Sequence, residues 1–225
     1  RGDPSAPDDP TPMAANVVRR CTVYNFGGVG LYAYGHGPTR LDHNHLFNGG
    51  RYCVDVSAIY LPTGDHLGGS EVDHNWLHDQ QGIGFRVDQR GRDITFHHNL
   101  VWNSLSGCKL EGFVMSAFNN TVLADNPAFP FVVVFDRGGT PQDSERWRIR
   151  NNVAFAFADR LSLRDDQAAA GRERFRPLAL RPGAIDHNLS IPPGKAAEYF
   201  VDPDTQDFRP RPGGPLDRTG VPVLR

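Results

Sequence analysis

The stretch Val72-Asp73-His74-Asn75 is one copy of a sequence motif that recurs along the chain: an apolar residue, a spacer, a histidine and then an asparagine. The other full copies are Leu41-Asp42-His43-Asn44, Phe96-His97-His98-Asn99 and Ile185-Asp186-His187-Asn188. Degenerate copies occur at Tyr24-Asn25, Asn119-Asn120 and Asn151-Asn152, so successive asparagines are 19, 31, 24, 21, 32 and 36 residues apart. A smallest spacing of about 20 residues with a variable excess predicts coils of fixed girth with loops of variable length.

A second sequence motif follows the first and has apolar residues at alternate positions. Its copies are Gly28-Val29-Gly30-Leu31-Tyr32-Ala33-Tyr34, Gly82-Ile83-Gly84-Phe85-Arg86-Val87-Asp88 and Gly107-Cys108-Lys109-Leu110-Glu111. This alternation is typical of a strand with one buried face. Each repeat then forms one rung of a solenoid, and stacked rungs pair their strands in parallel and bury a core that no single rung could form.

The recurring asparagine has two physical reasons. Asparagine tolerates the left-handed backbone conformation that a tight corner needs. Its amide can also hydrogen-bond to the equivalent asparagine one rung above and below, which forms a ladder. A β-sandwich or barrel would satisfy the alternation too, but an asparagine in register seven times would then be a coincidence. The pattern therefore predicts an all-β solenoid of about seven coils with an asparagine ladder.

On these repeats the sequence resembles the right-handed parallel β-helix proteins of the pectate-lyase-like superfamily, from about Asn16 to Ser190. Relatives in that superfamily include pectate, alginate and chondroitin lyases and several glycoside hydrolases. The resemblance implies that N-terminal coils are missing and that the protein is secreted, periplasmic or on the cell surface. We expect a tail over residues 1–14, coils over 15–192 with a lateral insertion at 159–183, and a closing segment over 193–225.

Charge and composition argue against several classes of protein. A formal net charge of −2 gives no electrostatic case for binding nucleic acid or an anionic membrane surface. No apolar run approaches the roughly 20 residues of a membrane span. Three cysteines, Cys21, Cys53 and Cys108, are too few and too unevenly spaced for a disulfide framework or a zinc site, so we interpret them as small buried residues. We expect a monomer whose partner is a polysaccharide or oligosaccharide.

Outward residues of neighbouring rungs should line up into a polar strip. When the apolar residues face inward, Arg86 and Asp88 point outward, as do Lys109 and Glu111 of the next rung. The expected register places Lys109 beside Gly84 and Glu111 beside Arg86. Lys109 stands out because the chain has only two lysines and 22 arginines. The candidate catalytic residues are Asp55, Arg86, Asp88, Lys109 and Glu111, and the candidate substrate-binding residues are Tyr32, Tyr34, Ser57, His78, Asp79, Asp136 and Arg137.

Such a strip fits saccharide chemistry, which needs acids and bases at the scissile bond, cations for uronate carboxylates and aromatic rings for sugars. In a lyase, Lys109 or Arg86 would remove the proton beside a uronate carboxylate. A neighbouring arginine, or calcium held by Asp55, Asp88 and Glu111, would neutralise that carboxylate. In a hydrolase, two carboxylates would act as acid and as nucleophile or base. The competing interpretation for Arg86 and Glu111 is a surface ion pair worth about 0–1 kcal/mol.

The histidines suggest a structural stack of rings along the coils more strongly than they suggest a metal site. His43, His74, His98 and His187 all precede a ladder asparagine, so the repeat itself predicts that they stack. The pair His78-Asp79 does not repeat, and a histidine oriented by an aspartate is a plausible base, although a surface turn explains the pair equally well.

Three functions remain open from the sequence. The first is cleavage of a polysaccharide by β-elimination or hydrolysis in a groove along one parallel sheet. The second is a non-catalytic surface protein, adhesin or glycan-binding module, in which the outward residues need not converge. A carbohydrate epimerase is the third, because its proton abstraction resembles the first step of a lyase.

Overall fold

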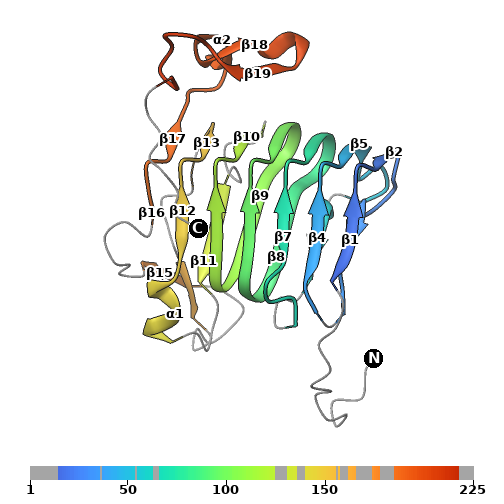
Figure 1. Ribbon diagram of the computed structural model, residues 1–225, viewed down its shortest axis with the longest axis vertical. Coiled ribbons are helices and arrows are strands. Elements are labelled where there is room, and N and C mark those ends of the chain that lie inside the picture. The colour runs from blue at the N-terminus through green and yellow to red at the C-terminus, as the bar shows by residue number, and fades with distance from the viewer. Residues whose placement is uncertain are drawn as a thin grey trace.

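The chain winds into a parallel β-helix with three sheets, and each described coil except the last contributes one stretch of strand to each sheet (Figure 1). The computed structural model describes residues 15–35, 37–53, 55–62, 66–124, 131–135, 140–155, 157, 162–165, 174–177 and 185–217. All strand pairs between coils are parallel among these residues. The predicted all-β solenoid is therefore confirmed.

The front sheet faces the viewer in Figure 1, where its strands stand side by side in sequence order. It consists of β1 (Asn16–Arg19), β4 (Thr39–Asp42), β7 (Glu71–Asp73), the ends of β8 (Trp76–His97) and β9 (Leu100–Phe118), β12 (Arg148–Arg150) and β16 (Ile185–Asp186). Its described strands come from seven successive coils, which agrees with the predicted number.

The second sheet follows the asparagine corner of each coil. It consists of β2 (Thr22–Tyr24), β5 (His45–Gly49), the starts of β8 and β9, β10 (Thr121–Leu123), β13 (Val153–Ala154) and β17 (Leu189–Ser190). The third sheet completes the coil with β3 (Leu31–Tyr32), β6 (Ser57–Leu61), the middles of β8 and β9, β11 (Phe131–Phe135) and β14 (Ser162–Asp165). The strand β15 (Arg174–Pro177) pairs with β14 in an antiparallel hairpin.

The core consists of columns of apolar side chains that run through successive coils. Leu46, Leu77, Val101 and Val122 are register partners on the second sheet, and all four are fully buried. Burying a side chain of this size contributes about 1.5–3 kcal/mol, so each added coil stabilises its neighbours. The alternate positions of the same strands face outward, and these are the positions where function can reside.

The asparagine ladder is present and continuous. Asn75 donates from its backbone N–H and from Nδ2 to Oδ1 of Asn99, at 3.1 and 2.9 Å, and a second Nδ2–H bonds to the carbonyl of Leu41 at 2.8 Å. The same pattern joins six buried or nearly buried residues: Asn44, Asn75, Asn99, Asn120, Asn152 and Asn188.

Two details of the ladder correct the expectation. The left-handed residue at each corner is the one before the asparagine, for example His43 with φ of 55° and His74 with φ of 53°. In addition, Asn25 is not a rung: the backbone N–H of Cys21 donates to Asn44 Oδ1, so Cys21 takes the ladder position of the first coil. Asn25 lies at the next corner and is left-handed itself, so the spacing of 19 residues does not measure a coil.

The cysteines also differ from the expectation. Cys108 is buried, and burial raises the pKa of its thiol well above the usual value. Cys21 and Cys53 are exposed, so the prediction of three buried cysteines is wrong for these two.

A short segment packs against the outer face of the second sheet after the last coil. It contains α2 (Ala196–Tyr199), β18 (Phe200–Asp202), a 3₁₀ turn at Pro203–Thr205 and β19 (Asp207–Pro210), and it stands at the top of Figure 1. Phe200 and Phe208 cover Trp102 in a second apolar cluster. The other helix, α1 (Pro141–Glu145), precedes β12. Neither helix of the described residues has the length and apolar character that a membrane crossing requires.

Candidate functional site

A column of outward side chains crosses the third sheet. Its register partners are Tyr32, Tyr60, Arg86, Lys109 and Val132 in successive coils. Lys109 therefore lies beside Arg86, and the predicted register, which placed it beside Gly84, is wrong by two residues. Because the shift is an even number, Lys109 still points outward.

Five charged side chains form one connected row on this sheet, which we call the charged row: Asp55, Arg86, Asp88, Lys109 and Glu111. Arg86 donates to Asp55 Oδ1 at 2.7 Å and to Asp88 Oδ2 at 2.7 Å. Lys109 Nζ lies 2.9 Å from Asp88 Oδ1 and 2.8 Å from Glu111 Oε2. The expected direct contact between Arg86 and Glu111 is thus replaced by a chain of alternating charges. The five candidate catalytic residues therefore lie together in one strip.

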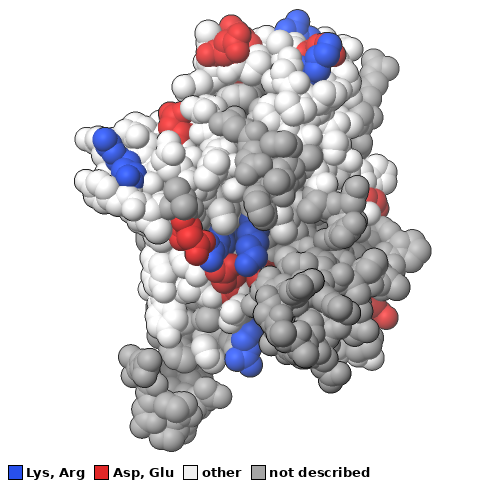
Figure 2. Space-filling view, turned by 180° about the vertical axis from the view of Figure 1, so that it is seen from behind, with Lys and Arg blue, Asp and Glu red and all other residues white. Residues whose placement is uncertain are grey.

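The row runs from solvent into the protein. The side chain of Asp55 is 83% exposed, whereas that of Glu111 is 3% exposed. Figure 2 shows the face behind the front sheet, where acidic and basic side chains meet near the middle of the view and most of the described surface around them carries no charge. Outer members of the row are open to a ligand, and inner members hold them in place.

The contacts within the row fix its charges. Burial alone would lower the pKa of Lys109, but hydrogen bonds to Glu111 and Asp88 raise it above the usual value. Burial would raise the pKa of Asp88, but hydrogen bonds from Arg86 and Lys109 lower it. Against the effect of burial, Asp88 and Asp55 also raise the pKa of Arg86. At neutral pH the lysine and arginine are therefore cations, which does not favour the proposed role of either as a proton-abstracting base.

Three tyrosines, which we call the tyrosine row, adjoin the charged row: Tyr32, Tyr34 and Tyr60. Tyr32 and Tyr34 are 57% and 69% exposed, and the ring of Tyr32 meets the ring of Tyr60 edge-on at 5.5 Å. The hydroxyl of Tyr60 donates to Asp88 Oδ2 at 2.9 Å, and the Arg86 guanidinium lies 4.7 Å from its ring centre. Burial and the Asp88 contact raise the pKa of Tyr60 to about 12. Tyr60 was not among the predicted residues, although its alternation with the buried Ile59 could have found it.

Other residues of the predicted site do not match the sequence-based expectation or cannot be compared with it. Ser57 is 1% exposed, because it shares the inward face with Ile59, so the prediction that it points outward is wrong. Asp136 and Arg137 lie outside the described residues. The three carboxylates expected to hold calcium are each paired with a side-chain cation, as Arg86 contacts Asp55 and Asp88 and Lys109 contacts Asp88 and Glu111.

A family model described as the right-handed β-helix region matches residues 10–126, which is slightly more than half of the chain. The chain belongs to this family. No curated protein and no solved structure matches it. The predicted right-handed parallel β-helix is thereby confirmed. Family membership describes the coil and not a reaction, so the function of this β-helix protein has to be argued from its side chains.

The predicted pair His78 and Asp79 lies on the second sheet of the β-helix, and not in the row that carries Arg86. Asp79 Oδ2 accepts from His78 Nδ1 at 2.7 Å, so the pair forms as expected. His78 Nε2 lies 2.7 Å from His45 Nε2, a partner that sequence reasoning missed. Burial and the neighbouring His78 lower the pKa of His45. The pair therefore belongs to a separate cluster.

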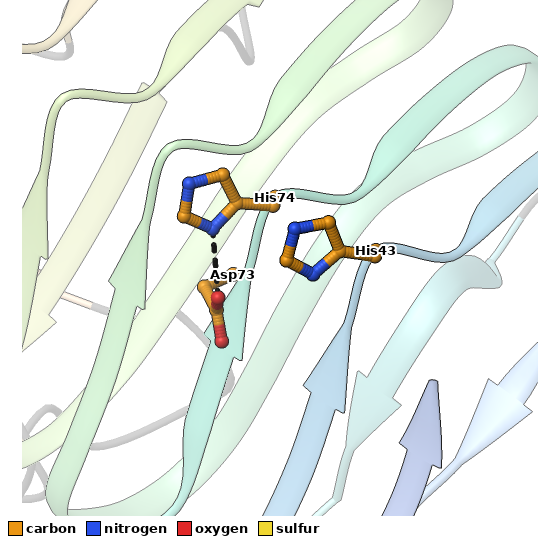
Figure 3. Close-up of side chains that lie close together, drawn as sticks. All are labelled: His43, Asp73 and His74. Carbon is orange, nitrogen blue, oxygen red and sulfur yellow. Dashed lines mark hydrogen bonds and ion pairs between the residues drawn. The ribbon is translucent and has the colours of Figure 1, made fainter. Parts of the chain in front are cut away.

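The histidine column on the front sheet of the β-helix is confirmed for three of its four predicted members, because Asn119 and Asn151 occupy the position in the two coils between His98 and His187. The rings of His43 and His74 are parallel at 4.8 Å, and those of His74 and His98 at 4.9 Å. Figure 3 shows His43 and His74 side by side, with Asp73 bonded to His74 at 2.8 Å. In-plane lone pairs of parallel stacked rings cannot point at one ion, so stacking explains this column better than metal binding does.

The outward face of the front sheet also carries an ion-pair network around Arg40. Its guanidinium bonds to Glu71, to Asp42 at 3.3 Å and to Asp73 at 3.0 Å. Among the described residues, the two sets of three potential ligands with atoms within 4.8 Å both include Asp73: one with His43 and His74, the other with Glu71 and His97. In both sets Arg40 already neutralises Asp73, so we interpret this network as a structural link between coils.

Proposed function

We propose that this β-helix protein binds a hydroxyl-rich polysaccharide along its third sheet. The observation that carries the proposal is the junction at Tyr60, whose ring contacts Tyr32 of the tyrosine row and whose hydroxyl bonds to Asp88 in the charged row. Sugar rings pack their C–H faces on aromatic rings, and their hydroxyls bond to carboxylates and cations. The exposed Tyr32 and Tyr34 supply the first kind of contact, and Asp55 supplies the second.

The charge of the row favours a neutral sugar over a polyuronate. Three carboxylates stand against two cations, so the five described side chains carry a net negative charge. A sugar hydroxyl can accept from Arg86 or Lys109 and donate to Asp55 without disturbing the ion pairs. A uronate carboxylate would have to displace one of these aspartates, which costs the existing charge-assisted bonds.

Bond cleavage is a second candidate, and Tyr60 favours elimination over hydrolysis. A phenol with a pKa of about 12 keeps its proton at neutral pH and can donate it to a leaving oxygen. Arg86 and Lys109 would then neutralise a uronate carboxylate, a different role from the base that the sequence suggested. The exposed carboxylate of Asp55 would accept the proton removed from the carbon beside that carboxylate. Hydrolysis needs a carboxylic acid that keeps its proton, and the lowered pKa of Asp88 argues against that residue in the role.

Binding is tested by titrating the protein with neutral and uronate-containing polysaccharides in a calorimeter. We expect the neutral chains to bind more tightly, and Tyr34→Ala or Arg86→Gln to weaken binding about 5- to 10-fold, as the loss of about 1–1.4 kcal/mol implies. Tyr52→Ala is the matched control, because Tyr52 is 91% exposed and outside both rows. If no polysaccharide of a broad panel binds, the proposal is wrong.

Cleavage is tested on the same panel. Elimination leaves a conjugated double bond that absorbs ultraviolet light, whereas hydrolysis leaves only a new reducing end. Binding without either product would support the non-catalytic, glycan-binding alternative. The proposal places the protein outside the cytoplasm, where polysaccharide chains are met.

A further inference from the structure

The lysine of the charged row is held from inside the protein. Lys109 Nζ lies 2.8 Å from Glu111 Oε2 and 2.9 Å from Asp88 Oδ1. The side chain of Glu111 is 3% exposed, whereas that of Lys109 is 32% exposed. An ammonium group has three N–H donors, and these two carboxylates account for two of them. Lys109 therefore presents to solvent an ammonium group whose charge is already compensated by a carboxylate beneath it.

Glu111 differs from Asp55, the outer carboxylate of the same row, in its freedom to move. The register partner of Glu111 in the next coil is Val134, which is itself buried, so the glutamate is enclosed. Asp55 is 83% exposed and contacts Arg86 at 2.7 Å. An exposed ion pair of this kind contributes little, because water screens it and the side chain can rotate away. A ligand can therefore displace Asp55 from Arg86, but it cannot displace Glu111 from Lys109.

This enclosed carboxylate affects anionic and neutral sugars differently. A uronate carboxylate that approaches Lys109 meets the ammonium group and, directly behind it, a second carboxylate that cannot turn aside. Like charges repel more strongly where little water separates them, so much of the attraction to Lys109 is cancelled. A sugar hydroxyl has no charge to repel and can accept a hydrogen bond from the third N–H of Lys109.

We propose that Glu111 is the specificity-determining residue of the third sheet, which makes the charged row select neutral glycans by compensating the charge of Lys109. The inference rests on the proposed function and assigns its preference for neutral chains to one buried side chain. Glu111 is a positioning residue, because it acts on the ligand through Lys109. Removing the charge of Glu111 should turn Lys109 into a docking point for a uronate carboxylate.

The test uses calorimetry on the complete chain with neutral hexasaccharides of glucose, galactose, mannose and xylose and with a galacturonate hexasaccharide. The readout is the dissociation constant of the galacturonate divided by that of the tightest neutral sugar. In Glu111→Gln the amide keeps the size and an acceptor for Lys109, and this ratio should fall about 10-fold. A structural role of Glu111 alone would change both dissociation constants by the same factor.

Two variants that remove the same unit of charge elsewhere serve as comparisons. Asp55→Asn lies in the charged row, but it should change the ratio less than about 2-fold, because water already screens that carboxylate. Glu198→Gln, at an exposed residue of α2 outside both rows, should leave the ratio unchanged. Circular dichroism checks that each variant folds. Should Glu111→Gln not fold, Glu111→Asp carries the test, because the shorter side chain withdraws the carboxylate from Lys109 and should lower the ratio about 3-fold.

The possible failures separate this inference from the proposal on which it rests. If the parent chain binds a neutral hexasaccharide and the folded Glu111 variant leaves the ratio unchanged, the inference is wrong and the glycan proposal stands. An equal fall of the ratio in Asp55→Asn would also overturn the inference, because the net charge of the row would then explain the preference. If the parent chain binds none of the hexasaccharides, the two proposals fall together.

Discussion

Each buried asparagine of the ladder forms more hydrogen bonds between coils than its size suggests. Each ladder residue satisfies backbone and side-chain groups of two neighbouring coils, and Asn99 alone makes hydrogen bonds to Asn75, Asn120 and the carbonyl of Val72. Unpaired buried polar groups cost about 1–3 kcal/mol each, so the ladder locks the coil register as well as stabilising the corner.

The ladder predicts the effect of Asn99→Ala. The change leaves several buried donors and acceptors unpaired, so we expect the free energy of unfolding to fall by about 3 kcal/mol or more. Urea denaturation measures it. Asn25→Gly is the matched control, because Asn25 is exposed, lies off the ladder and has a φ of 57° that glycine adopts freely. A loss of similar size in both variants would contradict the assignment of the ladder.

Tyr60 predicts how stability depends on alkaline pH. Its pKa is about 12 in the folded protein and about 10 when unfolded, so the fold favours the neutral phenol. The resulting stabilisation is fully present below about pH 10 and is lost as the pH rises towards 12. In Tyr60→Phe we expect a flatter decline of the free energy of unfolding over this range. Tyr52→Phe, which removes an exposed phenol, should follow the parent curve, and identical slopes in all three proteins would refute the assignment.

At the residue scale the sequence predicted that these side chains share one strip, but predicted neither their individual contacts nor their protonation. Asp55, Arg86, Asp88, Lys109 and Glu111 converge because alternation places them on one outward face. Whether Lys109 acts as a base depends on how many carboxylates it contacts, and that number follows from the register between coils. The repeated motifs do not specify this register between coils.

At the scale of the strand, irregularities in β8 explain the error in register. Pairing between β8 and β9 shifts between Gln80 and Ile83 and again between Val87 and Gly91. Extra residues at such bulges change which residues of two coils face each other, while alternation within each run is preserved. The alternation of apolar residues therefore predicts inward and outward faces correctly at most positions but places Lys109 two residues away from its true neighbour.

The close approach of β8 and β9 predicts the effect of Gly112→Ala. A Cβ at Gly112 would lie 2.6 Å from the Cα and 2.7 Å from the N of Gly91, and backbone cannot yield as a side chain can. We expect a loss of about 1–3 kcal/mol in the free energy of unfolding. Gly28→Ala is the control, since nothing lies within 4 Å of its added Cβ. Thermal or urea unfolding measures both, and an unchanged Gly112→Ala would show that the strands are further apart.

At the scale of the whole molecule, the coils form a stack whose three outer faces carry different kinds of side chain. The front sheet carries a charged and histidine-rich network, the second sheet carries aromatic rings under the segment that contains Phe200, and the third sheet carries the two proposed binding rows. The repeats predicted the stack itself. They did not predict the pairing of His45 with His78, because those two residues meet diagonally across coils and occupy different positions of the repeat.

The segment after the last coil predicts the effect of Phe200→Ala. Phe200 is 1% exposed and belongs to the apolar cluster around Trp102, so its truncation should cost about 3–5 kcal/mol. Water reaching Trp102 should also shift the tryptophan fluorescence to longer wavelength. Leu105→Ala, at a side chain that is 43% exposed, should change neither property much. An unshifted spectrum in Phe200→Ala would mean that the segment does not cover the sheet.

Hydroxyl-radical footprinting of the protein with and without a bound neutral oligosaccharide tests the central claim most directly, because it reports the solvent exposure of individual tyrosine and tryptophan rings. If the third sheet holds the sugar, oxidation of Tyr32 and Tyr34 falls on binding, while that of Tyr24 and Trp76 on the second sheet is unchanged. Protection of Tyr24 and Trp76 with Tyr32 and Tyr34 left open would contradict the account.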